Sequence, residues 1–125
     1  MNNHKVAVYG SLRKGLYNHC VLHGAKYLTT ANTKFPANLR DLGSFPYVHT
    51  TDTEDTDNPV VVEIYEVTDS GLQRLDDLEG YPSFYNRSQF EFSDGTKAWM
   101  YHIEDKNNKQ PLVESGDWVR YCEAL

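Results

Sequence analysis

Cysteines, basic residues and long apolar runs are all scarce in this chain of 125 residues. The two cysteines, Cys20 and Cys122, are too few for the disulfide framework of a small secreted protein, so we expect reduced thiols. No run approaches the roughly 18 consecutive apolar residues of a membrane span. The polar start also leads into a strand without a signal-type apolar stretch. We therefore predict a cytoplasmic protein with no membrane partner.

The shortage of positive charge argues against a nucleic-acid partner. The chain has 12 lysine and arginine residues against 18 aspartate and glutamate residues, a formal net charge of −6. This balance opposes binding to nucleic acid through counterion release, so we expect a partner that is a small molecule or a basic one. Hydrophobic residues make up 39% of the chain, which is enough for one core and a single domain over residues 1–125. The oligomeric state is not determined by the sequence.

Two segments predict strands because β-branched residues dominate them. They are residues 5–10, KVAVYG, and residues 59–67, PVVVEIYEV. Residues 87–103 predict a hairpin, with Asp94 and Gly95 in its turn.

Helical signals are clearest in residues 68–82, TDSGLQRLDDLEGYP. Asp69 or Ser70 is expected to cap the start of this helix, and Gly80 to end it. Residues 15–25 predict a second, short helix.

The other segments are less regular. Prolines in residues 35–48 favour irregular or edge structure. The acidic residues 50–59 lack the glycine and the terminal glutamate of a calcium loop and predict a solvated loop. The C-terminal residues 111–125 are expected to pack through three apolar side chains, Val113, Trp118 and Val119.

The stretch VAVYGSLRKG, residues 6–15, begins as a strand and turns at Gly10. Its two glycines have the spacing of a phosphate loop, but Leu16 and Tyr17 stand where such a loop needs Lys and then Ser or Thr. A nucleotide site is therefore not expected. Two interpretations remain open, an ordinary turn or a turn whose backbone N–H groups hold a carboxylate or phosphate.

A pair of histidines, His19 and His23, has the spacing of metal ligands on one helical face. Residue 20 is Cys, however, where a zinc-protease motif requires Glu. Histidine pairs of this kind are more often surface residues, so we expect no metal site.

Glu79 stands out among the acidic residues. At about 100° per residue it falls between Leu72 and Leu75 on the apolar face of the predicted helix. Burial and the negative end of the helix dipole would both raise the pKa of a carboxyl group there. Alternatively, the helix end frays and Glu79 points into water. The pattern of residues leaves both interpretations open.

Five segments, taken in order, resemble the γ-glutamylcyclotransferase-like family. They are VYGSLRKGLYNH, LGSFPYV, VEIYEV, LDDLEGYPSFYNR and AWMY, and the tail segment ESGDW is also similar to bacterial members. The resemblance covers Val6 to Tyr101. It implies an α+β fold with a single small, mostly closed β-barrel of mixed strands and a few flanking helices.

The resemblance also implies a site. In the family a Tyr-Gly-Ser-type turn binds the substrate through backbone amides, and a glutamate of the LDxxEG segment is the general acid and base. Glu79 is the matching glutamate here. The resemblance also implies the substrate-binding residues Tyr9, Gly10, Ser11, Leu12, Tyr85 and Tyr101. Tyr85 and Tyr101 could equally have a structural role.

The reaction implied by the resemblance is an internal cyclisation. The α-amino group of a γ-glutamyl compound attacks its own γ-carbonyl, which gives 5-oxoproline and releases the attached amine, with no metal or cofactor. Val62 stands where many members have Gly, which affects the expected substrate choice more than the chemistry. The alternative function is a binding module that captures a carboxylate-bearing metabolite or a partner in the same pocket.

The remaining charged residues near these motifs have simpler expected roles. Arg13 and Lys14 are expected at a solvated loop tip, and Arg87 is expected to pair with Asp77 or Glu91.

Overall fold

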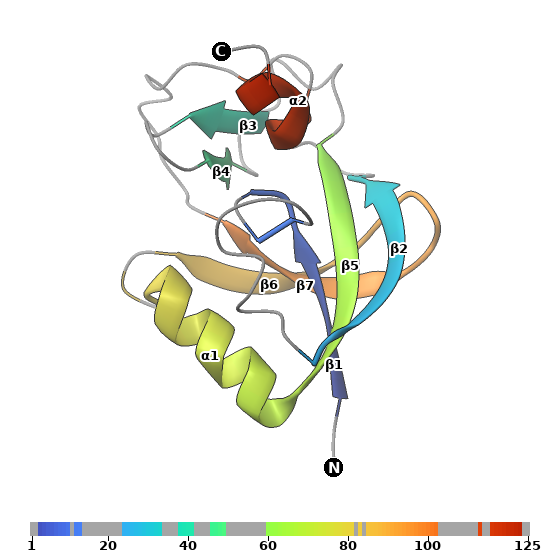
Figure 1. Ribbon diagram of the computed structural model, residues 1–125, viewed down its shortest axis with the longest axis vertical. Coiled ribbons are helices and arrows are strands. Elements are labelled where there is room, and N and C mark those ends of the chain that lie inside the picture. The colour runs from blue at the N-terminus through green and yellow to red at the C-terminus, as the bar shows by residue number, and fades with distance from the viewer. Residues whose placement is uncertain are drawn as a thin grey trace.

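The larger of two sheets has five strands in the order β2-β5-β1-β7-β6 (Figure 1). These strands are β1 (Asn3–Val8), β2 (Lys26–Asn32), β5 (Val61–Thr68), β6 (Asn86–Glu91) and β7 (Lys97–His102). The computed structural model describes residues 3–10, 12–13, 24–33, 38–41, 46–49, 60–81, 83, 85–102, 113 and 116–123. The predicted helix in residues 15–25, the acidic loop, Lys14 and the pair His19 and His23 lie outside these residues.

The sheet is mixed, as predicted, but the predicted barrel is wrong. Strand β1 pairs antiparallel with β5 and parallel with β7. The sheet remains open, with β2 and β6 as its edges. In the described residues these edges are joined by an isolated bridge between Thr33 and Phe92, just beyond the strand ends. A closed barrel would need a continuous ladder there, so the sheet curls without closing.

The helix predicted in residues 68–82 is α1 (Asp69–Glu79), but its cap differs from the prediction. Thr68, the last residue of β5, is extended, and its hydroxyl oxygen accepts the N–H of Gly71 at 3.2 Å. Asp69 and Ser70 therefore lie inside the first turn. At the other end Gly80 adopts the left-handed conformation, with φ of 68°, and ends the helix as predicted.

The smaller sheet pairs β3 (Asn38–Asp41) with β4 (Pro46–His49) in antiparallel fashion. Both strands are edges, in agreement with the expectation for this proline-containing segment. The second described helix, α2 (Trp118–Glu123), lies at the same end of the molecule, opposite the N-terminus (Figure 1). A hydrogen bond of 2.8 Å from the Tyr121 hydroxyl to Asp41 joins α2 to β3.

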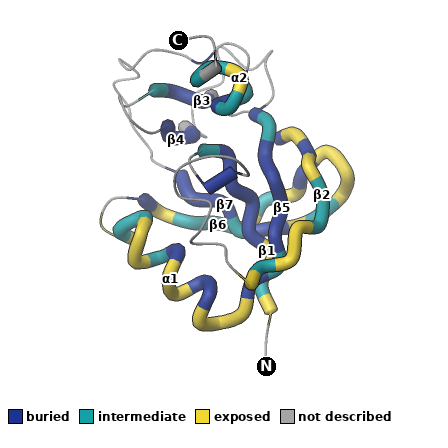
Figure 2. Tube along the Cα trace, in the orientation of Figure 1, coloured by how far each residue is buried: buried dark blue, intermediate teal, exposed yellow. Residues whose placement is uncertain are grey.

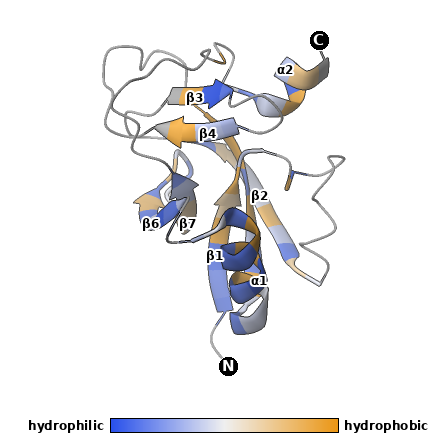
Figure 3. Ribbon diagram, turned by 90° about the vertical axis from the view of Figure 1, so that its left-hand side faces the viewer, coloured by the Kyte–Doolittle hydropathy of each residue, from blue (hydrophilic) through white to orange (hydrophobic). Residues whose placement is uncertain are grey.

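The core has two parts because side chains alternate between the two faces of the sheet. In β1, Ala7 belongs to one cluster, whereas Val6 and Val8 belong to the other. The first cluster includes Val113 and Trp118 near α2, and the second includes residues of α1. Figure 2 shows the buried middle of the sheet, and Figure 3 shows α1 beside β1 and below the small sheet.

Two apolar side chains, Leu78 and Val119, are more exposed than the buried apolar residues of the same helices. Leu72 and Leu75 are buried, but Leu78 is 43% exposed and does not extend the apolar face. Val119 is only partly buried, so Val113 and Trp118 anchor the C-terminal segment. Cys122 is a free thiol, as expected, while Cys20 lies outside the described residues.

Candidate active site

The last turn of α1 is held in place at Glu79. Just after the helix, the N–H of Tyr81 donates to the carbonyl of Asp76 at 3.0 Å. The N–H of Tyr85 donates to the carbonyl of Glu79 itself at 3.4 Å. The helix end therefore keeps its backbone contacts, and the alternative of a frayed end does not describe this structure.

The carboxyl group of Glu79 is partly buried, on the face of α1 that carries Leu72 and Leu75. Within the described parts of the chain it receives no hydrogen bond. Burial raises its pKa from the ordinary 4.5 to about 7, in the direction that the sequence predicted. A group with this pKa is half ionised at neutral pH, so it can both accept and release a proton.

Three buried tyrosines lie within electrostatic range of Glu79. Burial raises the pKa of the hydroxyl groups of Tyr9, Tyr85 and Tyr101, and the charge of Glu79 raises each pKa further. Because coulombic effects weaken with distance, this coupling places the three rings and the carboxyl group in one region.

The hydroxyl hydrogens of two of these tyrosines have acceptors other than Glu79. The Tyr85 hydroxyl donates to the carbonyl of Pro46 at 2.6 Å. The Tyr101 hydroxyl donates to Oδ1 of Asp76, also at 2.6 Å. These two tyrosines are therefore fixed by the protein.

The turn after β1 brings Gly10 to the same region. The N–H of Arg13 donates to the Gly10 carbonyl at 3.0 Å and closes the turn. A Cβ at residue 10 would lie 2.7 Å from Cγ of Pro46, so glycine is required by close approach. Pro46 also accepts the Tyr85 hydroxyl, which connects the turn to the tyrosines. Beside the turn, the Tyr9 hydroxyl donates to the Tyr101 carbonyl at 2.7 Å.

The structure thus gathers most of the residues implied by the family resemblance. Leu12 is buried and belongs to the cluster that contains the last two tyrosines, whereas Ser11 lies outside the described residues. Val62 is fully buried in the other cluster. The described residues that come together are Tyr9, Gly10, Leu12, Glu79, Tyr85 and Tyr101.

Asp76 is part of this region and was missed in the sequence. Arg87 donates to its two carboxylate oxygens at 2.8 and 3.1 Å, so the predicted pairing of Arg87 with Asp77 or Glu91 is wrong. Burial alone would raise the pKa of Asp76, but the hydrogen bonds from Arg87 and Tyr101 outweigh it and lower the pKa. The spacing offered a signal, because Asp76 precedes Glu79 by three residues and shares its helix face.

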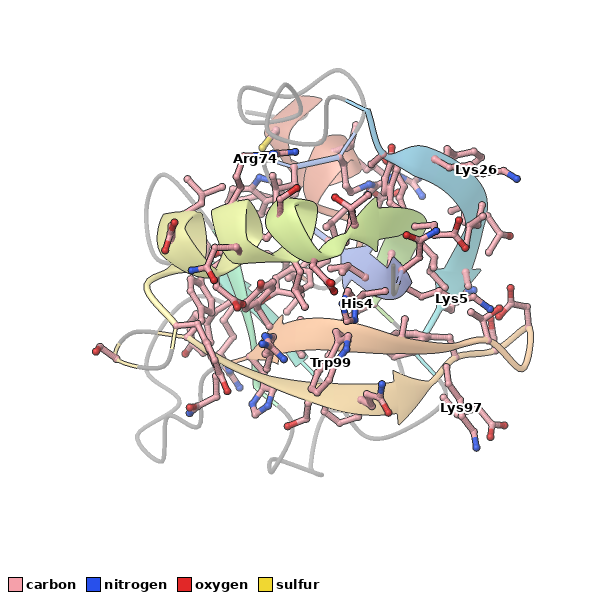
Figure 4. All side chains as sticks on the ribbon, turned by 90° about the horizontal axis from the view of Figure 1, so that it is seen from below. His4, Lys5, Lys26, Arg74, Lys97 and Trp99 are labelled. Carbon is pink, nitrogen blue, oxygen red and sulfur yellow. The ribbon has the colours of Figure 1, made fainter. Side chains whose placement is uncertain are left out.

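Two aromatic rings complete the surroundings of Arg87. Its guanidinium carbon lies 4.5 Å from the ring centre of Tyr81 and 4.4 Å from that of Trp99. Trp99 is labelled on β7 in Figure 4. These stacking contacts fix the guanidinium plane and connect the end of α1 to the β6–β7 hairpin.

Arg13 is buried, so the expectation of a solvated loop tip is wrong for this residue. Its Nε donates to Oε2 of Glu63 at 2.9 Å, and its Nη1 donates to Oδ1 of Asp117 at 2.6 Å. The Tyr65 hydroxyl donates to the other oxygen of Glu63 at 2.9 Å. A carboxylate in the middle of an apolar strand was the available signal, because a buried charge needs a partner.

The described residues contain no group of three or more His, Cys, Asp or Glu side chains that could hold a metal ion. Neither of the helices in the described ranges is long and apolar enough to cross a membrane.

Known proteins resemble the chain over nearly its whole length. Residues 6–120 match the family described as "Gamma-glutamyl cyclotransferase, AIG2-like". A Vibrio cholerae protein named "Putative gamma-glutamylcyclotransferase" is 36% identical, with 94% of this chain and 96% of that protein covered. The zebrafish Danio rerio protein "Gamma-glutamylaminecyclotransferase C" is 33% identical over 73% of this chain and 63% of its own length.

The fold is also found in solved structures. The crystal structure of an AIG2-like protein from Mus musculus has a TM-score of 0.79 and 27% identity, with 94% of this chain and 90% of that chain covered. A Pyrococcus horikoshii protein gives a TM-score of 0.78 at 27% identity, with 96% and 93% covered. Sequence and fold agree over the same residues, and the chain therefore belongs to the γ-glutamyl cyclotransferase, AIG2-like family of cyclotransferase enzymes.

Proposed function

We propose that this protein converts γ-glutamyl compounds into 5-oxoproline, with Glu79 as the general acid and base. The α-amino nitrogen attacks the γ-carbonyl carbon of the same molecule and forms the ring C–N bond. The original amide C–N bond then breaks, and the amine leaves. The reaction is internal, so the protein mainly holds the reactive conformation and moves protons.

The observation that carries this proposal is the burial of Glu79 near three tyrosines, and this burial raises its pKa to about 7. An α-ammonium group has a pKa of about 8 and must lose a proton before it can attack. Each unit of mismatch between base and substrate corresponds to about 1.4 kcal/mol. A carboxylate with a pKa near 7 can take this proton and then deliver it to the leaving nitrogen.

The turn at Gly10 is the proposed site for the substrate α-carboxylate. In this proposal the backbone N–H groups of residues Gly10, Ser11 and Leu12 bind the carboxylate. Tyr85 and Tyr101 contribute to substrate binding from the other side. Because the Tyr101 hydroxyl hydrogen is donated to Asp76, Tyr101 would accept a hydrogen bond from the substrate ammonium group.

γ-Glutamyl amines are the first substrate class to test, because the zebrafish relative is named for such compounds. γ-Glutamyl dipeptides and γ-glutamyl-lysine isopeptides complete the set, since they differ only in the leaving amine. Each compound is incubated with the parent protein, and 5-oxoproline is measured. If no compound of the three classes is turned over but one still binds, the protein is a binding module and the catalytic proposal fails.

The variant Glu79→Gln tests the role of the carboxyl group. It preserves the shape of the side chain, and we expect product formation to fall by at least about 10²-fold while the substrate still binds. Asp77→Asn is the matched control, because Asp77 is exposed on the same helix two residues away. The control should keep the parent rate. A Glu79→Gln variant with near-parent turnover would remove Glu79 from the chemistry.

A further inference from the structure

We propose that Arg13 is a positioning residue that clamps the Gly10 turn to the C-terminal segment through Asp117. The clamp would keep the turn in the shape that binds the substrate carboxylate, so the inference rests on the proposed function. In this arrangement the C-terminal segment controls substrate affinity without contacting the substrate.

Arg13 is tied to the turn and to two distant segments at once. Its backbone N–H closes the turn at the Gly10 carbonyl, 3.0 Å away. Its side chain contacts Glu63 of β5 and Asp117, which are 50 and 104 positions away in the sequence. The side chains of Arg13 and Glu63 are only 9% and 10% exposed. Movement of the guanidinium would therefore break one buried and one partly buried charged contact.

The charges in this cluster explain why Arg13 positions the turn and does not itself bind the substrate. One guanidinium faces two carboxylates, those of Glu63 and Asp117. Burial alone would lower the pKa of Arg13, but the hydrogen bonds that it donates to these carboxylates raise it, so the group stays charged. An incoming substrate carboxylate would have to compete with both acids. Holding the backbone is the role that leaves these contacts intact.

The C-terminal side of the clamp is itself fixed. The Asp117 oxygen that contacts Arg13 also accepts the N–H of Arg120, at 3.3 Å, in the first turn of α2. Just before it, the Gly116 carbonyl accepts the N–H of Val61 at 2.7 Å. Trp118, the first residue of α2, is buried in the core. Asp117 therefore connects an anchored helix to the turn.

The variant Asp117→Asn tests the clamp because it removes the charge and keeps the shape. We expect KM for a turned-over substrate to rise about tenfold, the loss of one charged hydrogen bond, with kcat within about twofold of the parent. Hydrogen exchange of the backbone amides in residues 6–13 should become faster. A purely structural role would lower the melting temperature without this selective rise in KM.

Asp41→Asn is the matched control. It weakens a hydrogen bond of similar length, 2.8 Å from Tyr121, that also anchors α2 but does not involve the turn. The control should leave KM and the exchange of residues 6–13 at their parent values. Arg13→Lys keeps the cation and serves as the second variant if Asp117→Asn does not fold. It should show the same rise in KM to a smaller extent.

The outcomes separate this inference from the proposed function. If the parent turns over no γ-glutamyl compound, the proposed function fails, while hydrogen exchange in the variants still decides whether Asp117 clamps the turn. Unchanged exchange in folded Asp117→Asn overturns the clamp. Unchanged KM in an active, folded variant overturns the inference as well. Equal effects of Asp41→Asn and Asp117→Asn would also overturn it, because they would indicate general loosening of α2.

Discussion

Two carboxyl groups in the last turns of α1 have opposite properties, although they are only three positions apart in the sequence. Asp76 faces the β6–β7 hairpin, where Arg87 and Tyr101 donate hydrogen bonds to it at 2.6 to 3.1 Å. Glu79 is also partly buried, but no such donor contacts its carboxyl group in the described residues. The pKa of Asp76 is lowered, whereas the pKa of Glu79 is raised to about 7.

The difference shows that burial and hydrogen-bond partners together decide the charge of a carboxyl group here. Both groups lose contact with water, and for both burial favours the neutral form. Among the described residues, donors to these two groups are found only at Asp76, which therefore remains an anion and holds Tyr101 in place. The group without donors can change its protonation state at neutral pH. One helical turn thus provides a fixed charge and a proton-exchanging group.

Among the changes that test this comparison, removal of Arg87 should have the largest effect on stability. Arg87→Met leaves the Asp76 anion without its cation, and the free energy of unfolding should fall by about 3 kcal/mol, because the pair is largely buried. Chemical denaturation at pH 7 measures this loss. The double variant Arg87→Met with Asp76→Asn should regain about half of it. A loss below about 0.5 kcal/mol would mean that solvent screens the pair.

Glu79→Gln should abolish a pH dependence of stability. In the parent the folded pKa, about 7, lies above the unfolded value of about 4.5. Between these values the folded protein retains a proton that the unfolded chain has released. The parent free energy of unfolding should therefore fall as pH rises from about 4.5 to 7, and then level off.

The size of the stability difference between Glu79→Gln and the parent follows from the same shift in the pKa of Glu79. At pH 8 the Gln variant should be more stable than the parent by about 1 to 3 kcal/mol, because it has no charge to bury. Denaturation curves at several pH values measure the difference, with Asp77→Asn as the control. A constant difference between variant and parent from pH 4 to pH 8 would contradict a raised pKa, and an unfolded variant would identify Glu79 as a structural residue.

Tyr101→Phe should have the smallest effect of the three. It removes one of the donors to Asp76 but leaves Arg87 in place, so stability should fall by about 1 kcal/mol. The pKa of Asp76 should rise while remaining below that of Glu79, which nuclear magnetic resonance titration of the side-chain carboxyl groups can measure. If Asp76 in this variant titrated near pH 7, Tyr101 and not Arg87 would be the main source of the contrast.

Local features of the fold were predictable because their causes lie within a few residues. Asp94 accepts the N–H of Thr96 at 2.9 Å in the hairpin turn, and Gly95 has a φ of 86°, as the Asp-Gly pair predicted. Gly80 ends α1 for a similar local reason. The position of Glu79 on the apolar face followed from helical periodicity alone.

The amino-acid sequence by itself determined the strands β1 and β5, the hairpin, the presence of α1 with its end at Gly80, and the glutamate placed to lose water. Tertiary structure alone decided that the sheet stays open and that Arg13 is buried between Glu63 and Asp117. It also decided that Arg87 binds Asp76. The physical reason is the separation in sequence of the residues that interact. Periodicity and caps depend on near neighbours, whereas the charge of a buried group depends on partners that only the folded chain brings into contact.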